Sequence, residues 1–344
     1  MPREVLVIKL GTAVITDNEG NIDTEVVKKV AAEVAALNKK YNIVLVSSGA
    51  VGCGKKYLKD YKGTLFERKA AAAVGNPILI QLYHQQLHKH GLTVAQALCE
   101  RVHFSNRVQF VQLKQTFSTF WENNIIPVVN ENDLVSNVEI KFSDNDELAT
   151  LIAIGFDASS LILCTSAGGL LDDRKQVIKR IEKVDASILK YVSTEKSGLG
   201  LGGMISKLTF ARLALSLGIN VVICGLKSDH PVADALAGKN GSYFVPQKSN
   251  LRARQKWLAS GSLTLGTIHV DKGAAKALQS RKSLLTIGIK NAEGKFTEGE
   301  VVQIMDEEGN IIGVAKTRLG APLVTKQLSV KNVIAAHADD IVLF

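Results

Sequence analysis

Two lysines stand out because an isolated charge would be costly at either position. Lys9 lies near the end of the apolar run Val5–Leu10, just before Gly11. Lys207 ends the glycine-rich segment SGLGLGGMISK and opens a stretch with a helical pattern. A lysine in such surroundings needs an anionic partner. We interpret both as candidates for phosphate chemistry, and for Lys9 the alternative is a lysine whose stem covers the edge of a sheet.

Two segments contain several glycines each. SSGAVGCG covers residues 47–54, and its glycines would let the backbone N–H groups approach an anion. The segment 197–207 matches G-x-G-x-x-G but lacks the GK[ST] of a P-loop, and no strand directly precedes it. It therefore suits a polyphosphate better than a nicotinamide dinucleotide. The alternatives are an ordinary strand-to-helix turn for the first segment and a flexible surface loop for the second.

Acidic and amide side chains gather in two further segments, NENDLVSN from Asn130 and DNDELA from Asp144. Carboxylates and amides at such loops can hold an ammonium group, a Mg²⁺ ion or a lysine. Helix capping is the alternative, and it fits Asp144, which lies three residues before Glu147. Capping accounts for one acid but not for the whole set. The set comprises Glu131, Asp133, Asp144 and Asp146 with Asn130, Asn132 and Asn145.

These residues together predict phosphoryl transfer, which needs positive charge around the moving group more than it needs covalent chemistry. Lys9 and Lys207 could supply that charge from opposite sides, and Asp146 could hold both lysines in position. A unit charge about 4 Å away contributes on the order of 4 kcal/mol at an effective dielectric near 20. The sequence shows no Ser/His/Asp or Cys/His arrangement that would indicate nucleophilic catalysis.

The elements that must position these residues alternate between apolar strands and helical patterns. This order predicts an α/β fold, a three-layer sandwich in which helices cover both faces of a mostly parallel sheet. Such a sheet binds its ligands beyond the carboxyl ends of the strands. We expect a break near Gly75 and Pro77 in the helix at 67–89. The predicted strands are 5–10, 43–47, 92–98, 125–129, 160–164 and 220–224, and the other predicted helices are 24–39, 106–121, 146–155 and 207–217.

The pattern changes after residue 255, where short strands at 267–270, 299–305 and 311–316 surround one helix at 273–280. We predict two domains: a catalytic domain over 1–255 and a small mixed β domain over 262–344. The connector 235–261 has five basic residues and no acidic one after Ala235, which favours a solvated linker over a phosphate-facing segment.

Composition and charge restrict the classes of function that this protein can have. The 344 residues are 46% hydrophobic and 22% charged, which excludes a mainly disordered or collagen-like chain. The net charge is +9, but residues 262–344 have ten basic and nine acidic side chains, so the excess lies on the larger domain. That distribution favours phosphate chemistry over nucleic-acid binding by the small domain.

The cysteines and the apolar runs indicate the cellular setting. Four isolated cysteines without a CxxC pair argue against a zinc site and a disulfide framework. We also find no signal peptide and no apolar run long enough to span a membrane. We therefore expect a cytoplasmic protein that makes no membrane contact. The cysteines are Cys53, Cys99, Cys164 and Cys224.

Five motifs in order resemble the amino acid kinase family: KLGTAVIT, VSSGAVGCG, IPVVNENDLV, FSDNDELA and GLGLGGMISK. The paired NEND and DND segments are most similar to the glutamate 5-kinase group within that family. The C-terminal segments GTIHVDKGAAKAL and FTEGEVVQI resemble a PUA domain. The resemblance covers nearly the whole chain.

The resemblance implies an activity and its partners. The chain would transfer the γ-phosphoryl group of ATP to the γ-carboxylate of L-glutamate, the first step of proline biosynthesis. Mg²⁺ would be required, held mainly by the ATP phosphates rather than by the protein. Feedback inhibition by proline at the glutamate site is also usual in the family. We expect a homo-oligomer, and the charge distribution argues against nucleic acid as a partner.

The resemblance also assigns residues. Lys9 and Lys207 would stabilise the moving phosphoryl group, and Asp146 would organise them. The residues that would bind glutamate are Ser48, Gly49, Asp133, Asp144 and Asn145. The residues that would bind ATP are Lys9, Gly11, Thr165, Ser166, Leu201, Gly202, Gly203, Met204, Ile205, Ser206 and Lys207.

The chain departs from the family pattern on the ATP side. Ser166 stands where the family usually has an aspartate, and Leu201 where a threonine is common. The segment GLLDDRKQ also lacks the usual Tyr-x-x-Asp-Pro stretch. We hypothesise that Arg174 and Lys175 partly replace the lost contacts.

Two other functions stay open. A kinase of the same fold could use another acceptor, such as acetylglutamate, aspartate, carbamate or a nucleoside monophosphate; the NEND and DND acids favour an acceptor with a free amino group. An RNA-binding protein acting through the small domain is the second alternative, and the near-neutral charge of that domain weighs against it.

Overall fold

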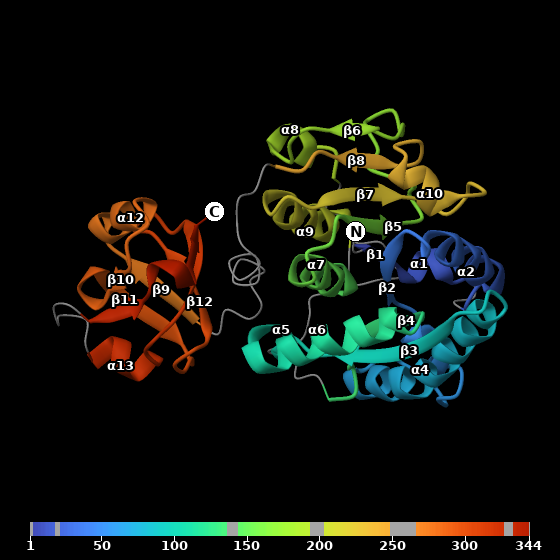
Figure 1. Cartoon of the computed structure of the whole chain (residues 1–344), viewed down its shortest axis with the longest axis horizontal. Helices are drawn as coiled ribbons and strands as arrows, with labels where there is room; N and C mark the ends of the chain where they lie inside the picture. The colour runs from blue at the N-terminus through green and yellow to red at the C-terminus, as the bar shows by residue number, and fades with distance from the viewer. Residues whose placement is uncertain are drawn as a thin grey trace. The chain divides into compact units, whose positions relative to one another are not determined.

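The computed structural model describes residues 3–17, 21–135, 144–192, 203–247, 266–326 and 333–343. The chain forms two compact units (Figure 1). The first comprises residues 1–100 and 112–249, and the second comprises 101–111 and 250–344. The predicted connector between the domains lies largely outside the described residues, so the boundary between 255 and 262 stays a prediction.

The first unit is built on one sheet with the strand order β3-β4-β2-β1-β5-β7-β8-β6. All neighbours from β3 to β7 are parallel, whereas β8 runs antiparallel to β7. The predicted mostly parallel sheet is therefore confirmed, and the carboxyl ends of the six parallel strands from β3 to β7 lie at one edge. The strands are β1 (Glu4–Leu10), β2 (Tyr41–Ser47), β3 (Thr93–Cys99), β4 (Ile125–Glu131), β5 (Ser160–Cys164), β6 (Arg180–Ile181), β7 (Asn220–Cys224) and β8 (Ser242–Phe244).

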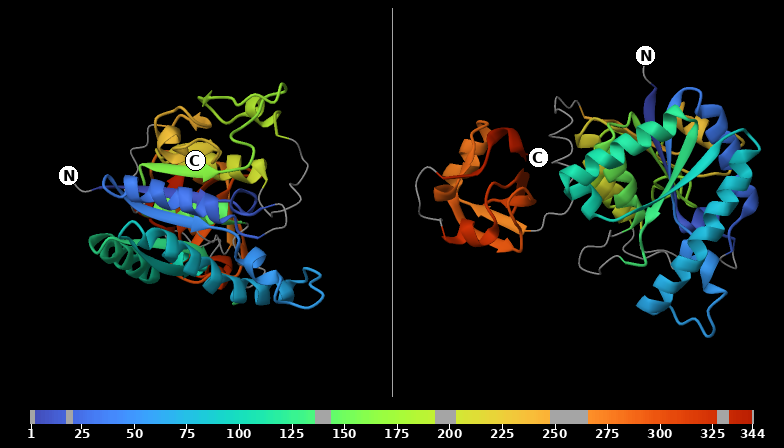
Figure 2. Two further views of the ribbon diagram at one scale, coloured as in Figure 1. Left: turned by 90° about the vertical axis from the view of Figure 1, so that its right-hand side faces the viewer. Right: turned by 60° about the horizontal axis from the view of Figure 1, so that its bottom comes forward.

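Helices cover both faces of this sheet (Figures 1 and 2). Helix α2 contacts α4 and α10 on one face, and α7 contacts α9 on the other. Phe117 of α6 packs on Phe156, just beyond α7, with ring centroids 4.9 Å apart. The helices of the first unit are α1 (Thr12–Ile15), α2 (Thr24–Leu37), α3 (Ala50–Lys55), α4 (Leu65–His88), most of α6 (Arg107–Glu122), α7 (Asn145–Gly155), α8 (Ala186–Leu189), α9 (Met204–Ser216) and α10 (Pro231–Leu236). Helix α5 (Val102–Ser105) and the first residues of α6 fall within residues 101–111 of the second unit.

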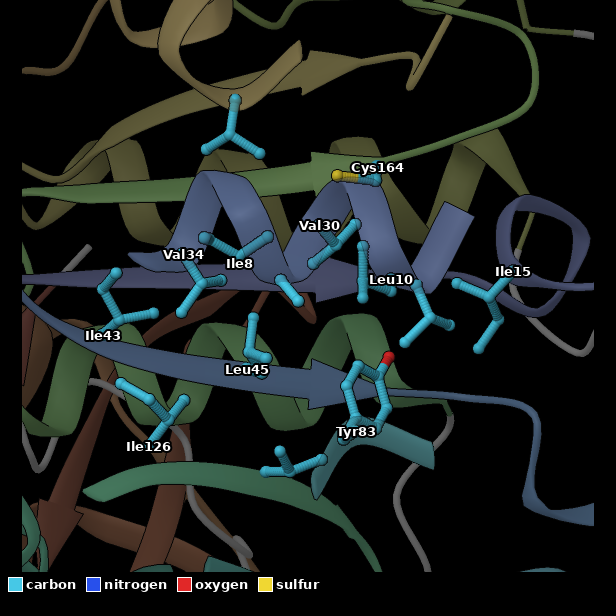
Figure 3. Packing of buried hydrophobic residues seen from close by; sticks show 14 of the residues in the cluster. Ile8, Leu10, Ile15, Val30, Val34, Ile43, Leu45, Tyr83, Ile126 and Cys164 are labelled. Carbon is cyan, nitrogen blue, oxygen red and sulfur yellow. The ribbon is translucent and has the colours of Figure 1, made fainter. Parts of the chain in front are cut away.

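The side chains of β1 point alternately to the two faces of the sheet, so this one strand contributes to both helical layers. Ile8 and Leu10 belong to the core cluster formed with Val30 and Val34 of α2 (Figure 3). Successive side chains of a strand point to opposite faces. Lys9 therefore points toward the α7 face, away from this apolar core. The strand thus contributes core packing on one side and a charged group on the other.

Helix α4 corrects two of our expectations. It runs unbroken through Gly75 and Pro77, because Pro77 and Ala73, whose carbonyl the proline leaves free, both lie on the exposed side where water can bond. Gly75 and Gly54 instead let α4 and α3 cross closely. A Cβ atom on Gly75 would lie 1.7 Å from the Ala50 carbonyl oxygen, and one on Gly54 would lie 1.9 Å from that of Ala71. Gly54 therefore serves helix packing rather than an anion.

The second unit has its own sheet, in the order β11-β9-β12-β13-β15, and a separate pair, β10 with β14. Strands β9 and β12 are parallel and the other described pairs antiparallel, as expected for a small mixed β domain. Ile268, Val302 and Ile304 are central to its core. The elements are β9 (Gly266–Val270), α12 (Lys272–Gln279), β10 (Leu284–Leu285), β11 (Ile289–Gly294), β12 (Val301–Met305), β13 (Ile311–Lys316), α13 (Ala321–Lys326), β14 (Ile334–Ala336) and β15 (Ile341–Leu343).

No helix in the described parts of either unit is long and apolar enough to cross a membrane.

The crossing of α3 and α4 yields a first prediction. A helix-interior Gly→Ala change ordinarily stabilises by about 0.5–1 kcal/mol. Gly75→Ala should instead lower the free energy of unfolding by about 1–3 kcal/mol, because the new methyl group forces the two helices apart. Urea unfolding measures the change, and Val74→Ala, at a position 40% exposed on the same helix, is the control. Equal or greater stability of Gly75→Ala would refute the close crossing.

Candidate active site

Three charged side chains from distant segments meet at the carboxyl edge of the sheet. Lys9 is the penultimate residue of β1, Asp146 is the second residue of α7, and Lys207 lies in the first turn of α9. Lys9 Nζ lies 2.6 Å from Asp146 Oδ1, and Lys207 Nζ lies 3.0 Å from Asp146 Oδ2. Their exposed fractions are 5%, 0% and 6% for Lys9, Asp146 and Lys207. One buried carboxylate therefore separates two buried ammonium groups.

The charge balance of this triplet decides its ionisation. Burial raises the pKa of Asp146, but the positive charges of Lys9 and Lys207 lower that pKa by more, so it lies below its usual range. Asp146 is therefore ionised at neutral pH. Two ammonium groups against one carboxylate leave a net charge of +1 in a dry place, which is an arrangement that attracts a further anion.

Asp144, the residue before Asn145, fixes the start of α7. Asp144 accepts hydrogen bonds from the backbone N–H groups of Asp146 (2.9 Å) and Glu147 (3.1 Å), so the expected helix cap is present. Its other oxygen accepts a hydrogen bond from the Ser206 hydroxyl at the start of α9. Thr150 donates to the Asp146 carbonyl at 2.8 Å. The cap and the Thr150 bond stabilise the start of α7, and the bond between Asp144 and Ser206 holds the starts of α7 and α9 beside each other.

An amide cluster lies next to the charged triplet. Asn145 Nδ2 is 2.9 Å from Asn130 Oδ1, 3.1 Å from Ser48 Oγ and 3.2 Å from the Ser47 carbonyl oxygen. The ends of β2 and β4 therefore meet the start of α7 at one point. Asp133 lies two residues beyond the end of β4 and is half-buried.

Three of the expected glycines, Gly11, Gly49 and Gly203, have different surroundings. Gly11 follows β1, and a Cβ atom there would lie 3.6 Å from Lys9 Nζ, against the ammonium group. Gly49 has φ +104° at the start of α3, a conformation that favours glycine, and a Cβ atom there would lie 2.9 Å from Ile15 and Ile22. Gly203 begins α9, and nothing described lies within 4 Å of where its Cβ would be.

The other residues expected on the ATP side are more scattered. Thr165 follows β5 and donates its N–H to the Cys224 carbonyl at 2.8 Å, while Ser166 is exposed. Met204, Ile205 and Ser206 form the first turn of α9, and Ile205 is 49% exposed. Leu201 and Gly202 lie outside the described residues.

The segment that contains Arg174 and Lys175 forms a small turn closed by the bridge between Leu171 and Val177. Asp172 accepts the N–H of Arg174 at 2.9 Å, and Lys175 has φ +58°. Both basic side chains are exposed. The structure does not bring them into contact with the charged triplet, and their role stays a hypothesis.

Two polar residues of α4, Asn76 and Tyr83, lie beside the site but are not predicted from the sequence. Asn76 accepts a hydrogen bond from Asn130 Nδ2 at 3.1 Å, and the Tyr83 hydroxyl lies 2.8 Å from Ser47 Oγ. The signal in the sequence is weak: both are uncharged polar side chains in a stretch, Ala70 to Leu87, that contains no Asp, Glu, Lys or Arg.

The remaining expectations concern metals and thiols. Within the described residues no group of three or more His, Cys, Asp or Glu side chains could hold a metal ion. The four cysteines, Cys53, Cys99, Cys164 and Cys224, are buried free thiols.

Comparison with known proteins agrees with this geometry. Residues 4–225 match the amino acid kinase family, and residues 266–328 match the PUA domain. The chain belongs to the amino acid kinase family. Both expected resemblances are thereby confirmed.

The similar proteins include several glutamate 5-kinases. The one from Caldanaerobacter subterraneus subsp. tengcongensis is 35% identical over 319 residues, covering 89% of this chain and 86% of that protein. The one from Bacteroides thetaiotaomicron is 34% identical, covering 90% of each. A third, from Streptococcus pneumoniae, is 35% identical and covers 92% of this chain and 89% of that protein. The resemblance to the glutamate 5-kinase group is confirmed.

The chain is also similar to one solved structure, the UMP kinase from Ureaplasma parvum. The alignment covers 72% of this chain and 100% of the UMP kinase chain, with 15% identity and a TM-score of 0.48. That similarity is too low to inform the site.

The charged triplet yields a second prediction. Asp146→Asn should lower the free energy of unfolding at pH 7 by about 3–5 kcal/mol, because two buried ammonium groups lose their counter-charge. The folded pKa of Asp146 is lowered, so its stabilisation is complete above the unfolded pKa of about 3.9 and is lost as pH falls toward the folded pKa. The stability difference between the two proteins should therefore shrink below about pH 4.

Urea unfolding at a series of pH values from 7 to 3 measures this difference. Asp60→Asn, at an exposed loop residue, is the control and should match the unmodified chain throughout. A difference for Asp146→Asn that stays constant across the series would contradict the role of the two lysines.

Proposed function

We propose that this chain transfers the γ-phosphoryl group of ATP to the γ-carboxylate of L-glutamate, giving ADP and L-glutamyl 5-phosphate, the first step of proline biosynthesis. The observation that carries the proposal is the pair of lysines on the two oxygens of buried Asp146. The names of the similar glutamate 5-kinases support the choice of acceptor.

The chemistry of the acceptor fits a site made of positive charge. A γ-carboxylate has a pKa near 4.3 and is already ionised at neutral pH. One of its oxygens forms the new bond to the γ-phosphorus while the bond to the β-phosphate oxygen breaks, and the electron pair leaves with ADP. No proton has to be removed from the acceptor. What the protein must supply is stabilisation of negative charge on the phosphoryl oxygens and both bridging groups.

Lys9 and Lys207 supply this charge from two elements, β1 and α9. Asp146 keeps the two ammonium groups apart and oriented, because each lysine contacts a different oxygen of its carboxylate. The N-terminus of α9 adds backbone N–H groups and the positive end of the helix dipole. Gly11 gives the phosphate oxygens room beside Lys9.

We assign glutamate to the neighbouring amide cluster. Ser48 and Asn145 would bind it directly, with Gly49 in the same turn, and Asp133 and Asp144 would offer carboxylates toward its ammonium group. ATP would lie along Gly11, Thr165, Ser166 and the start of α9, including residues 201–207. Mg²⁺ would arrive with ATP and be held mainly by the phosphate oxygens.

Three further properties belong to the same proposal. The product leads to proline, and we propose that proline inhibits the enzyme at the glutamate site. We also propose a homo-oligomer that acts in the cytoplasm, without nucleic acid as a partner.

Release of ADP with a panel of acids tests the proposed function. The panel contains glutamate, aspartate and N-acetylglutamate with MgATP, and hydroxylamine traps an acyl phosphate as the hydroxamate. Glutamate alone should give both signals. Turnover of another acid in place of glutamate would change the assigned acceptor, and no turnover of any acid would remove the proposal.

A third prediction concerns Lys207. Lys207→Ala should lower kcat by about a thousandfold, because about 4 kcal/mol of electrostatic stabilisation of the transition state is lost. KM for glutamate should change little, since the lysine acts on the phosphoryl group. Lys89→Ala, at the exposed end of α4, is the control. Steady-state kinetics distinguish this from a loss of glutamate affinity, which would contradict the assigned role.

A fourth prediction concerns the departures on the ATP side. If Arg174 replaces lost nucleotide contacts, Arg174→Ala should raise KM for ATP several-fold and leave KM for glutamate unchanged, because the guanidinium group suits phosphate binding. Lys183→Ala, at another exposed basic residue of the same segment, is the control. An unchanged KM for ATP would remove Arg174 from the ATP site.

A further inference from the structure

Helix α4 buries two uncharged polar side chains on one face, seven residues apart. Asn76 is 8% exposed and Tyr83 is fully buried, and residues two turns apart lie on the same side of a helix. A buried polar group is costly unless it is hydrogen-bonded. Each of the two has found one partner at the end of a strand, Asn130 in β4 for Asn76 and Ser47 in β2 for Tyr83.

The two contacts differ in what they can control. Ser47 presents its backbone carbonyl to Asn145, and that carbonyl is fixed by the sheet, because Ser47 pairs with Leu10 and the next N–H donates to the Leu10 carbonyl at 3.0 Å. Asn130 presents a side-chain oxygen instead. Only the side-chain amide of Asn130 can rotate without breaking hydrogen bonds of the sheet.

Asn76 and the Glu131 backbone N–H together set which way the Asn130 amide faces, and Asn76 is the partner that holds its NH₂ end. Asn76 Oδ1 accepts from Asn130 Nδ2 at 3.1 Å, so the NH₂ group of Asn130 points to α4. Asn130 Oδ1 is then free to accept from Asn145 Nδ2 at 2.9 Å and from the Glu131 N–H at 2.9 Å. The reverse orientation would place two NH₂ groups against each other and lose both bonds.

We infer that Asn76 is a positioning residue for acceptor binding: through the amide of Asn130 it holds Asn145 in place at the end of the sheet. The inference rests on the proposed function in one respect, the assignment of Asn145 to the acceptor. It adds a residue of α4, on the opposite face of the sheet from α7, to the determinants of acceptor affinity.

The test removes the acceptor oxygen of Asn76 while keeping the branched shape of the side chain. Asn76→Leu has the same number of side-chain heavy atoms and leaves Asn130 Nδ2 without its partner. KM for glutamate should rise about tenfold, with kcat within about twofold and KM for ATP unchanged. Asn76→Asp keeps an acceptor oxygen and should recover most of the affinity. Asn76→Ala provides a second removal of that oxygen in case Asn76→Leu does not fold.

Tyr83→Phe is the matched control. It removes a buried hydrogen bond from the same face of the same helix, and it should lower stability without a tenfold rise in KM for glutamate. In the background of Asn130→Ala, the additional change Asn76→Leu should have little further effect on KM, because the amide it orients is gone.

A readout independent of activity separates this inference from the proposed function. The ¹H–¹⁵N signal of the Asn145 side-chain amide, assigned by its loss in Asn145→Ala, should move in Asn76→Leu and stay in Tyr83→Phe. If another acid proves to be the acceptor, the same KM comparison applies to that acid. The inference is overturned by an unmoved Asn145 signal, by an unchanged KM, or by equal effects of Asn76→Leu and Tyr83→Phe.

Discussion

The site depends on one buried carboxylate with an ammonium group on each of its oxygens. Burying any of these three charges alone would cost several kcal/mol, so the contacts of Asp146 with Lys9 and Lys207 are a condition for the fold as well as for the chemistry. The triplet is not neutral, however. Its remaining positive charge lies where water is largely excluded, and an incoming phosphoryl group would complete the balance that Asp146 begins.

The parallel sheet is what makes this meeting possible. A strand contributes Lys9, and the first turns of α7 and α9 contribute Asp146 and Lys207, each from a different part of the chain. Parallel strands bring their carboxyl ends to a single edge, and the helices that follow start there. Only one side of β1 is needed for the site, since Ile8 and Leu10 remain in the apolar core. Stability and function thus use opposite faces of the same strand.

The sequence predicts the outline of this arrangement for identifiable reasons. Strands β1, β2 and β5 each contain a run of at least three apolar residues and are followed by glycine or polar residues, so their positions can be predicted from the sequence pattern. Lys9, Asp146 and Lys207 are conspicuous because charged residues border apolar runs. The cap at Asp144 follows from its spacing to Glu147, and the structure has it.

What the sequence does not reveal depends on partners that only tertiary packing supplies. Glycines at anion-binding loops and at helix crossings have the same sequence signal, so the sequence does not show that Gly54 serves a helix crossing. Pro77 normally interrupts a helix, but an exposed position lets water take the place of the missing bond. Asn76 has no local signal that points to Asn130, because the two meet only after α4 packs on the sheet.

The start of α7 explains why three consecutive residues can perform three tasks. Asp144 is the extended N-cap residue, and Asn145 and Asp146, the first two helical positions, are about 100° apart, so the three side chains point to different surroundings. Asp144 joins the backbone of its own helix to Ser206 of α9, Asn145 reaches the ends of β2 and β4, and Asp146 reaches the two lysines. A shift of the helix start by one residue would turn all three away from their partners together. The cap that stabilises α7 therefore also sets the register on which the charged triplet and the amide cluster depend, and folding and acceptor chemistry cannot be tuned separately at this turn.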